Sequence, residues 1–294
     1  MSKRYNLDRH ELGFWHIQPS PTLEDLRAFY LDRYYPKQEA DQKVLQYASD
    51  YGALELEHKR IAGMEALRML DRPPGSMLEI GVGEGFFLDE FHRAGWTIQG
   101  VDFTIDAVKR WKPHLAGMVT ATDIGEYLAS RSAAGDQFDL IALNNVIEHV
   151  LDPVELMFRV RKMLVPGGVV RVAMPNEASW IQSRAVALGH AEEEFWVMPP
   201  EHLNYFDAVS GARTLQHCGF HVADLLADFP IDMFLLSKDT AYTLNRSFGR
   251  AAHEVRLRFE TELARRSLDQ LIAFRKGCAM SGVGRNLIFY AQVD

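Results

Sequence analysis

The sequence predicts an α/β fold with a doubly wound, mostly parallel sheet. Two observations carry this prediction: short apolar runs recur along the chain, and stretches of helical length separate them. The runs lie at 77–82, 97–102, 118–122, 138–144 and 169–174. Such alternation is typical of βαβ units, in which helices cover both faces of a buried sheet. Later apolar runs at 220–226 and 286–292 predict two more strands.

The segments outside this alternation divide the chain into four parts. A Pro-Pro-Gly break at 73–75 precedes the first strand. A mostly helical pattern separates the last two strands, and an apolar stripe there is expected to face the main body; it comprises Ala252, Val255, Phe259 and Leu263. The predicted parts are an N-terminal helical extension or lid at 1–75, a core at 76–228, a helical cap insertion at 229–284 and the last strand of the sheet at 285–294.

Composition narrows the partners of the protein. Forty acidic residues against 32 basic ones give a formal charge of −8, which argues against a nucleic-acid partner. The sequence has no long apolar run and no apolar signal core, so we expect a cytoplasmic protein without a membrane partner. Two cysteines suit neither a disulfide framework nor a zinc site. Composition does not decide between a monomer and a homodimer.

A glycine-rich turn follows the first predicted strand. Glu79 precedes Gly81, Gly83 and Gly85 in an acidic-x-Gly-x-Gly-x-Gly pattern. Glycines in such a turn let a ligand approach the backbone N–H groups. A dinucleotide fingerprint would need Gly or Ala where Phe86 stands, so NAD is disfavoured. The next strand ends in Asp102, whose carboxylate is suited to accept hydrogen bonds from ribose hydroxyls.

This pattern resembles the first motif of the class I, Rossmann-like methyltransferases that use S-adenosylmethionine (SAM). The resemblance implies a seven-stranded methyltransferase sheet and SAM as the cofactor. Asp123 is implied as an adenine contact, although it fits equally well as the N-cap of a helix over 124–130. The cofactor-binding residues that the resemblance implies are Glu79, Gly81, Gly83, Gly85, Asp102, Phe103, Asp123, Ile124 and Asn144.

The segment 138–153 resembles the fourth-strand motif of the same methyltransferases. If the connection after this strand is helical, Asn145, Glu148 and His149 share one face. Asn-x-x-Glu-His followed by the later His202 is similar to ubiquinone-pathway O-methyltransferases and small-RNA 2′-O-methyltransferases, where Glu-x-x-Glu-His and a downstream His gather a divalent metal. Asn145 replaces the first Glu here, which weakens a metal site because an amide brings no charge.

Three interpretations of this group stay open. The four residues bind a divalent metal, which is possible but not favoured; or His202 or His149 acts as a base or orients the acceptor without metal; or the histidines are structural. We expect His202, Glu148 and His149 to be catalytic, because an imidazole of pKa near 6.5 is suited to take a proton from a hydroxyl.

The segments outside the core are loosely similar to appendages of methyltransferases from bacterial sugar and polysaccharide pathways. We therefore expect O-methylation of a hydroxyl on a small polar acceptor, such as a sugar or sugar nucleotide in carbohydrate biosynthesis. N- or C-methylation of another small metabolite and a non-catalytic SAM-binding subunit are the alternatives. Three tyrosines of the N-terminal segment either close over the cofactor or belong to the core: Tyr30, Tyr34 and Tyr35.

Overall fold

A computed structural model of the chain describes residues 5–29, 47 and 49–294. It confirms the predicted seven-stranded sheet, whose order is β5-β4-β3-β6-β7-β10-β9. The strands are β3 (Ser76–Ile80), β4 (Thr97–Asp102), β5 (Val119–Ala121), β6 (Phe138–Asn144), β7 (Leu164–Pro175), β9 (His221–Ala227) and β10 (Asn286–Gln292). Tyr30, Tyr34 and Tyr35 lie outside the described residues.

The register of the sheet brings the ends of several strands to one edge. Strands β5, β4, β3, β6 and β7 are parallel, whereas β10 is antiparallel to both β7 and β9. Ile80 pairs with Val101 on one side and with Leu143 on the other. The residues that follow these positions therefore meet at the carboxyl edge, where open α/β sheets bind their ligands.

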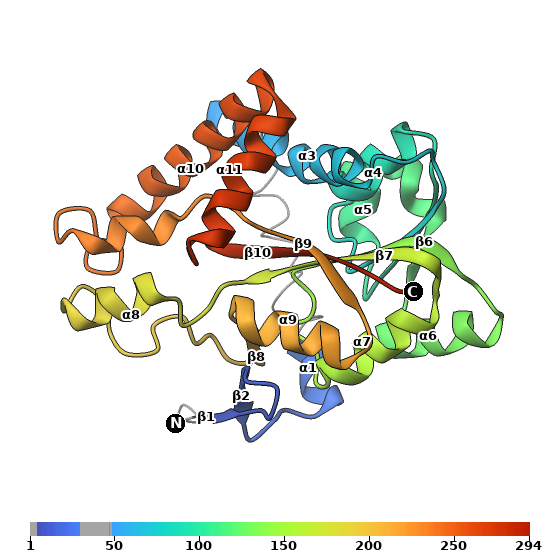
Figure 1. Cartoon of the computed structure of the whole chain (residues 1–294), viewed down its shortest axis with the longest axis horizontal. Helices are drawn as coiled ribbons and strands as arrows, with labels where there is room; N and C mark the ends of the chain where they lie inside the picture. The colour runs from blue at the N-terminus through green and yellow to red at the C-terminus, as the bar shows by residue number, and fades with distance from the viewer. Residues whose placement is uncertain (1–4, 30–46, 48) are drawn as a thin grey trace.

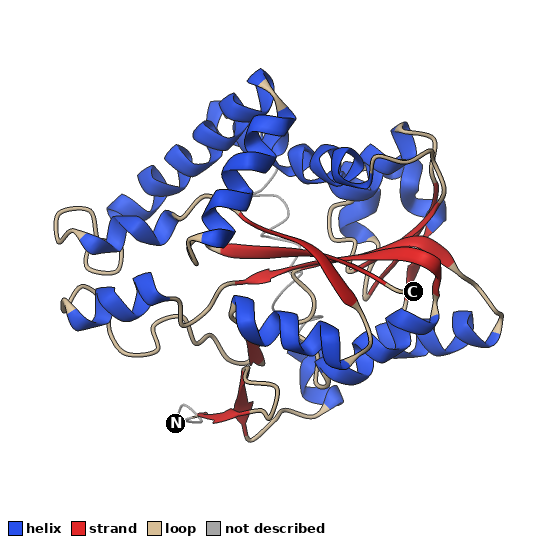
Figure 2. Ribbon diagram, viewed as in Figure 1, coloured by secondary structure: helices blue, strands red, loops and turns tan. Residues whose placement is uncertain are grey.

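Helices cover both faces of the sheet (Figures 1 and 2). One layer contains α3 (Asp50–Leu70), α4 (Phe86–Arg93), α5 (Asp106–Trp111), α10 (Ser247–Arg266) and α11 (Leu268–Met280). The opposite layer contains α6 (Ile124–Ala133), α7 (Pro153–Lys162) and α9 (Ala208–His217). Shorter elements outside these layers are η2 (Pro113–Met118), α8 (Trp180–Ala187) and η3 (Ile231–Leu236). Across the ranges that the structure describes, no helix combines the length and the apolar character needed to cross a bilayer.

The core lies on both faces of β6. Leu140 and Ala142 pack on the side of α3 and α4, whereas Ile141 and Leu143 pack on the side of α6 and α7. All four side chains are buried. Because successive side chains of a strand point to opposite faces, a strand covered on both sides is apolar throughout. This is why β6 appears in the sequence as an uninterrupted apolar run.

We expected a helical N-terminal extension, but part of it forms strands. Besides α1 (Leu23–Phe29) and α3, it contains the strands β1 (Asn6–Arg9) and β2 (Trp15–Gln18), which form a hairpin. Strand β2 also pairs with β8 (Asn204–Tyr205), so a second, three-stranded sheet joins the start of the chain to the segment after β7. Each strand is too short to show alternation, and the partner of β2 is remote in sequence.

The insertion between β9 and β10 is mostly helical, as predicted, and part of its expected apolar stripe is buried. Ala252 is buried, whereas Val255 and Phe259 are 47% and 42% exposed. The other buried residues of α10 include Leu257 and Glu260. Glu260 binds His58 of α3 and Arg275 of α11 at 2.6 and 2.8 Å. The buried face of α10 therefore contains a carboxylate that the pattern of apolar residues does not predict.

Candidate active site

The glycine turn after β3 has the geometry that its sequence predicts. Gly81 has a φ of 76°, and a Cβ atom there would lie 2.5 Å from Cγ2 of Val146. Gly85 is the N-cap of α4 and provides no side-chain cap. Glycine is therefore required at position 81 both by the left-handed conformation and by the close approach of the turn after β6.

Asp102, the last residue of β4, lies directly beside this turn. Its side chain is buried, and Oδ2 accepts a hydrogen bond from the Gly83 N–H at 2.8 Å. The carboxylate is thus fixed at the carboxyl edge of the sheet by the turn itself. A carboxylate held in this way is suited to ribose hydroxyls at the same edge.

A cleft of about 1790 Å³ runs along this edge. Typical ligand pockets have about 300–1,000 Å³, so the cleft has room for a cofactor and an acceptor together. Asp123 lines the cleft and is also the N-cap of α6, where it accepts from the Glu126 N–H at 3.1 Å. The cleft is lined by all nine predicted cofactor residues, namely Glu79, Gly81, Gly83, Gly85, Asp102, Phe103, Asp123, Ile124 and Asn144. Their contacts with SAM stay a prediction.

Glu79 is the buried acidic group of the turn. It is 2% exposed, and Asn144 donates to its Oε1 at 2.9 Å. Burial raises the pKa of Glu79 to about 8, and the nearby Asp102 also raises it, whereas Asn144 and Arg171 lower it. Arg171, which no motif in the sequence indicated, also lines the cleft and contacts Asn144. An arginine in the middle of the apolar strand β7 was the available signal.

The connection after β6 is a turn and not the helix on which the shared face of Asn145, Glu148 and His149 depended. Asn145 has a φ of 55°, a left-handed conformation that asparagine tolerates better than most residues. The His149 N–H donates to the Val146 carbonyl at 2.9 Å. Asp152 caps α7 through the Glu155 N–H at 2.8 Å, as the sequence predicts. The turn still brings Glu148 and His149 together.

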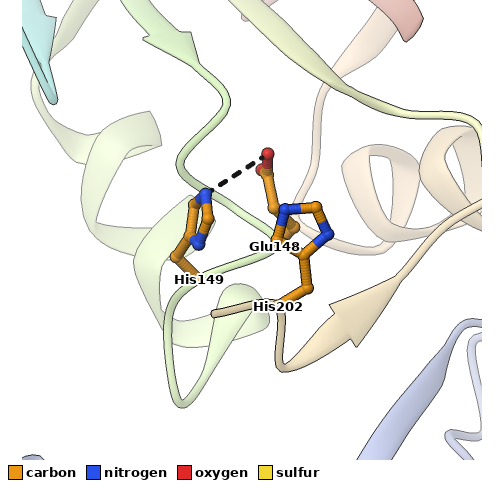
Figure 3. A group of neighbouring side chains, drawn as sticks. All are labelled: Glu148, His149 and His202. Atoms are coloured by element: carbon orange, nitrogen blue, oxygen red, sulfur yellow. Dashed lines mark ion pairs between the residues drawn. The ribbon is translucent and has the colours of Figure 1, made fainter. Parts of the chain in front are cut away.

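Glu148, His149 and His202 form a compact cluster (Figure 3). One ligand atom from each side chain lies within 4.8 Å of the other two. His149 Nε2 is 3.6 Å from Glu148 Oε1, and the two imidazole rings meet edge to face with centroids 4.9 Å apart. The fold thus unites the three residues that the sequence analysis proposed as catalytic.

Several polar atoms of the cluster are buried without a hydrogen bond. Both carboxylate oxygens of Glu148 and Nδ1 of His202 are buried without a hydrogen-bond partner among the described residues. Burial raises the pKa of Glu148 to about 8, and the carboxyls of Glu177 and Glu201 raise it too. Burial lowers the pKa of His202 to about 3, with His149 and Arg285 adding to the effect. The His202 imidazole is therefore held in its neutral form, and its expected catalytic role stays a prediction.

Only one member of the cluster reaches the cleft. Among the described residues that line it are His149 and Asn145, but not Glu148 or His202. His149 Nδ1 lies 2.6 Å from the Glu201 carbonyl oxygen, so we assign the ring proton to Nδ1 and the lone pair to Nε2. Burial lowers the pKa of His149. His149 is therefore the cluster residue placed to meet a ligand.

The N-terminal hairpin supports the segment that carries His202. The Ile17 N–H donates to the Leu203 carbonyl at 3.0 Å, and the Leu203 N–H donates to the Glu148 carbonyl at 2.7 Å. The Asn204 side-chain amide donates to the Val150 carbonyl at 2.7 Å. Three remote parts of the chain therefore hold the cluster, namely the N-terminal hairpin, the turn after β6 and the segment before β8. No pattern in the sequence predicted the hairpin.

The residues of the cluster fit a divalent metal. Three ligand atoms bound at about 2.1 Å around one ion lie about 3.0–3.6 Å from their nearest neighbours, so the three atoms, now within 4.8 Å of one another, would have to move closer together to hold it. Two neutral imidazoles and a buried carboxylate are ordinary ligands for such an ion. An ion would also satisfy the unpaired oxygens of Glu148.

The seven-stranded sheet with antiparallel β10, the glycine turn and the carboxylate at the end of β4 define a class I SAM-dependent methyltransferase. A family model described as "Methyltransferase domain" matches residues 54–225. The chain belongs to this methyltransferase family.

Curated relatives of the core are O-methyltransferases. A ubiquinone biosynthesis O-methyltransferase from Caulobacter sp. (strain K31) is 31% identical over 137 residues, covering 43% of this chain and 50% of that protein. One from Actinobacillus pleuropneumoniae serotype 5b (strain L20) is 25% identical over 162 residues, covering 49% and 68%. The chain spans about half the length of the first relatives that it matches.

Solved structures share the fold at low identity. Magnesium protoporphyrin IX methyltransferase from Synechocystis PCC 6803 has a TM-score of 0.53 at 11% identity, covering 93% of this chain and all of that chain (100%). The Burkholderia thailandensis 1,6-didemethyltoxoflavin-N1-methyltransferase has a TM-score of 0.52 at 13% identity, covering 98% and 100%. Both hold S-adenosylhomocysteine. The likeness concerns the fold alone.

Proposed function

We propose that this protein transfers the methyl group of SAM to a hydroxyl of a small polar acceptor, such as a sugar or sugar nucleotide. The observation that carries the proposal is the placement of His149 in the same cleft as the glycine turn and Asp102. O-methylation is supported by the names of the curated relatives. A polar acceptor is supported by the side chains of Asn145, His149 and Glu201 at that part of the cleft.

The proposed reaction needs alignment and one proton acceptor. The acceptor oxygen forms a bond to the methyl carbon, the bond from sulfur to that carbon breaks, and the electron pair stays on sulfur. Holding the oxygen about 3–3.5 Å from the methyl carbon supplies much of the rate. The hydroxyl proton passes to His149 Nε2. Glu148, with Oε1 3.6 Å from that nitrogen, stabilises the imidazolium once its carboxyl is ionised.

Glu148, His149 and His202 are the residues that would hold a divalent metal. A bound metal supplies Lewis acidity, which lowers the pKa of a hydroxyl near it. His202 is not among the described residues that line the cleft, so in either case we assign it to orienting the cluster and not to taking the proton. Asn145 stays a candidate ligand at the edge of the cleft.

A second acceptor class is favoured by the relatives. Their names place them in ubiquinone biosynthesis, and we take a phenol as the second class to test. Phenols lose a proton more readily than sugar hydroxyls. A phenolic acceptor would depend less on a base. The loss caused by His149→Ala therefore distinguishes the two classes.

The test is formation of S-adenosylhomocysteine from SAM with sugar nucleotides, free sugars, phenols and amines. We expect turnover with a hydroxyl compound, and a decrease of about 10² to 10⁴ in His149→Ala if the acceptor is a sugar. His190→Ala removes a half-buried histidine outside the cleft and serves as the control. Turnover with amines alone would overturn O-methylation, and SAM binding without turnover on any acceptor would favour a non-catalytic subunit.

The metal is tested in the same assay with and without a chelator. We expect a metal-dependent enzyme to lose turnover on chelation and to regain it with one added divalent ion, and His202→Ala to lose the response to that ion. Equal turnover in wild type with and without chelator would leave His149 as a base without metal.

A further inference from the structure

A row of buried polar side chains lies beneath the cofactor part of the cleft. Asn144 donates to Glu79 through Nδ2, and its Oδ1 accepts from Arg171 Nη1. Arg171 is on β7, two strands from Glu79, and is 2% exposed. The Asn144 amide thus bridges the acidic group of the glycine turn and a buried guanidinium.

Arg171 is held from three further directions. Its Nε donates to the Tyr290 hydroxyl at 3.2 Å, and its Nη2 lies 3.7 Å from Glu65 Oε1. The guanidinium carbon lies 5.0 Å from the centroid of the Phe87 ring. Strand β10, α3 and α4 therefore each contribute a contact that limits where Arg171 can direct Nη1.

Core stability does not explain such an arrangement. Burying an ion pair costs desolvation that an apolar replacement would avoid, and such replacements are often neutral or stabilising. Arg171 and Asn144 also line the cleft, next to the glycine turn. The second oxygen of Glu79 is buried without a hydrogen-bond partner among the described residues. These observations indicate a site prepared for a cationic group.

We propose that Arg171 is a positioning residue for the cofactor: it fixes the Asn144 amide, and Asn144 fixes the Glu79 carboxylate toward the ammonium group of SAM. The inference rests on the proposed function, since SAM is the ligand. Arg171 itself touches neither the cofactor nor the acceptor in this role. Its contribution reaches the cofactor through two hydrogen bonds.

The arrangement makes SAM affinity depend on pH. Glu79 faces Asp102 of β4 and Arg171 of β7, besides the neutral Asn144 of β6. A cationic ligand favours the ionised carboxylate, so SAM should bind more weakly as the pH falls below about 8. The ammonium group of SAM itself loses its proton at about pH 8, so binding should weaken again at higher pH, and the midpoint on the acid side is the one that reports Glu79. Arg171 lowers the pKa of Glu79, so its loss should move the midpoint of this dependence to higher pH.

The experiment is calorimetric titration with SAM from about pH 6 to about pH 10, for wild type, Arg171→Met and Arg171→Lys. We expect Arg171→Met to weaken SAM binding at pH 7 about tenfold, with a raised midpoint. Arg171→Lys keeps the positive charge but loses the planar guanidinium group, so it should bind SAM more tightly than Arg171→Met and more weakly than wild type.

Gln182→Met is the control. Gln182 is 1% exposed, its amide donates to the Asp232 carboxylate at 2.9 Å, and it is not among the described residues that line the cleft. It should lower the melting temperature without changing SAM affinity or the pH midpoint. If Arg171→Met does not fold, the charge-balanced Glu65→Gln/Arg171→Met variant replaces it, with the same expected shift.

Wild-type affinity and midpoint in Arg171→Met would overturn the inference, and so would an equal shift in Gln182→Met. If wild type itself binds no SAM, the proposed function fails and the inference with it. Normal SAM binding and unchanged Arg171 variants would refute only the positioning role.

Discussion

The two parts of the cleft are built in different ways. The cofactor part is formed by the ends of adjacent strands, where Gly81, Asp102 and Asn144 come together through the register of one sheet. The acceptor part, around His149, depends on the turn after β6, the segment before β8 and the N-terminal hairpin. The first is a consequence of local sequence, whereas the second depends on contacts between remote segments.

This difference indicates that binding of the cofactor and use of the acceptor can be damaged separately. A regular parallel sheet specifies its carboxyl edge whenever its strands form. The position of His202 depends instead on a three-stranded sheet whose strands have four, four and two residues. Substitutions in the two parts should therefore divide into two classes.

The largest effect is expected from Ile17→Ala. Ile17 is 1% exposed and packs with Leu26, Leu203 and Tyr205, so its truncation should cost the small sheet about 2–5 kcal/mol. Methyl transfer should fall more than the affinity for SAM, as measured by turnover and calorimetry on one preparation. Leu215→Ala, a core truncation on α9, is the control and should lower only stability. Parallel loss of turnover and SAM affinity in Ile17→Ala would contradict the separation.

Asp102→Ala tests the cofactor part of the cleft. Losing a charge-assisted hydrogen bond costs about 1.5–3 kcal/mol, which corresponds to about 10- to 150-fold weaker binding of SAM. Asp123→Ala provides a comparison, because its N-cap role predicts a loss of about 1 kcal/mol in stability. Calorimetry showing wild-type SAM affinity in Asp102→Ala would remove this residue from the cofactor site.

The smallest effect concerns two carboxyls, one in each part. Burial raises the pKa of both Glu79 and Glu148 from 4.5 to about 8. Between these pH values the folded protein binds more protons than the unfolded chain, so the free energy of unfolding should decrease as the pH rises toward 8. With chelator and without SAM, Glu148→Gln should raise the melting temperature at pH 8.5, by about 2–4 °C for each kcal/mol regained, and leave it unchanged at about pH 3, where Glu148 is protonated in both states.

Glu193→Gln, at an exposed position, is the control for this measurement. A melting temperature of Glu148→Gln that follows wild type at every pH would show that the pKa of Glu148 is the same in the folded and the unfolded chain. Glu79→Gln should behave like Glu148→Gln in stability, but it should also weaken the binding of SAM.

The sequence predicts the sheet well because each strand is marked by its own residues. The strands β4, β6 and β10 begin and end where their apolar runs do, and Asp152 and Pro153 begin α7 as their types require. The glycine turn is equally local, because Gly81 directly follows β3 and adopts a left-handed conformation that favours glycine. Every predicted cofactor residue accordingly lines the cleft.

What could not be predicted depends on distance and burial. Strand β2 carries no signal by itself, because its partner β8 is only two residues long and remote in sequence. The pKa of His202 falls to about 3 through desolvation, which no spacing of residues reveals. Arg171 and Glu65 appear in the sequence as single charges on a strand and a helix, and only the fold makes them partners.

The pairing of β2 with β8 also orders events during folding. His16 pairs with Asn204, so the hairpin must wait until most of the sheet has been synthesised before it finds its third strand. Closing so large a loop is slow compared with forming neighbouring βαβ units. Until β2 pairs with β8, the segment that carries His202 lacks one of its supports, so the cofactor part of the cleft would form before the acceptor part is complete.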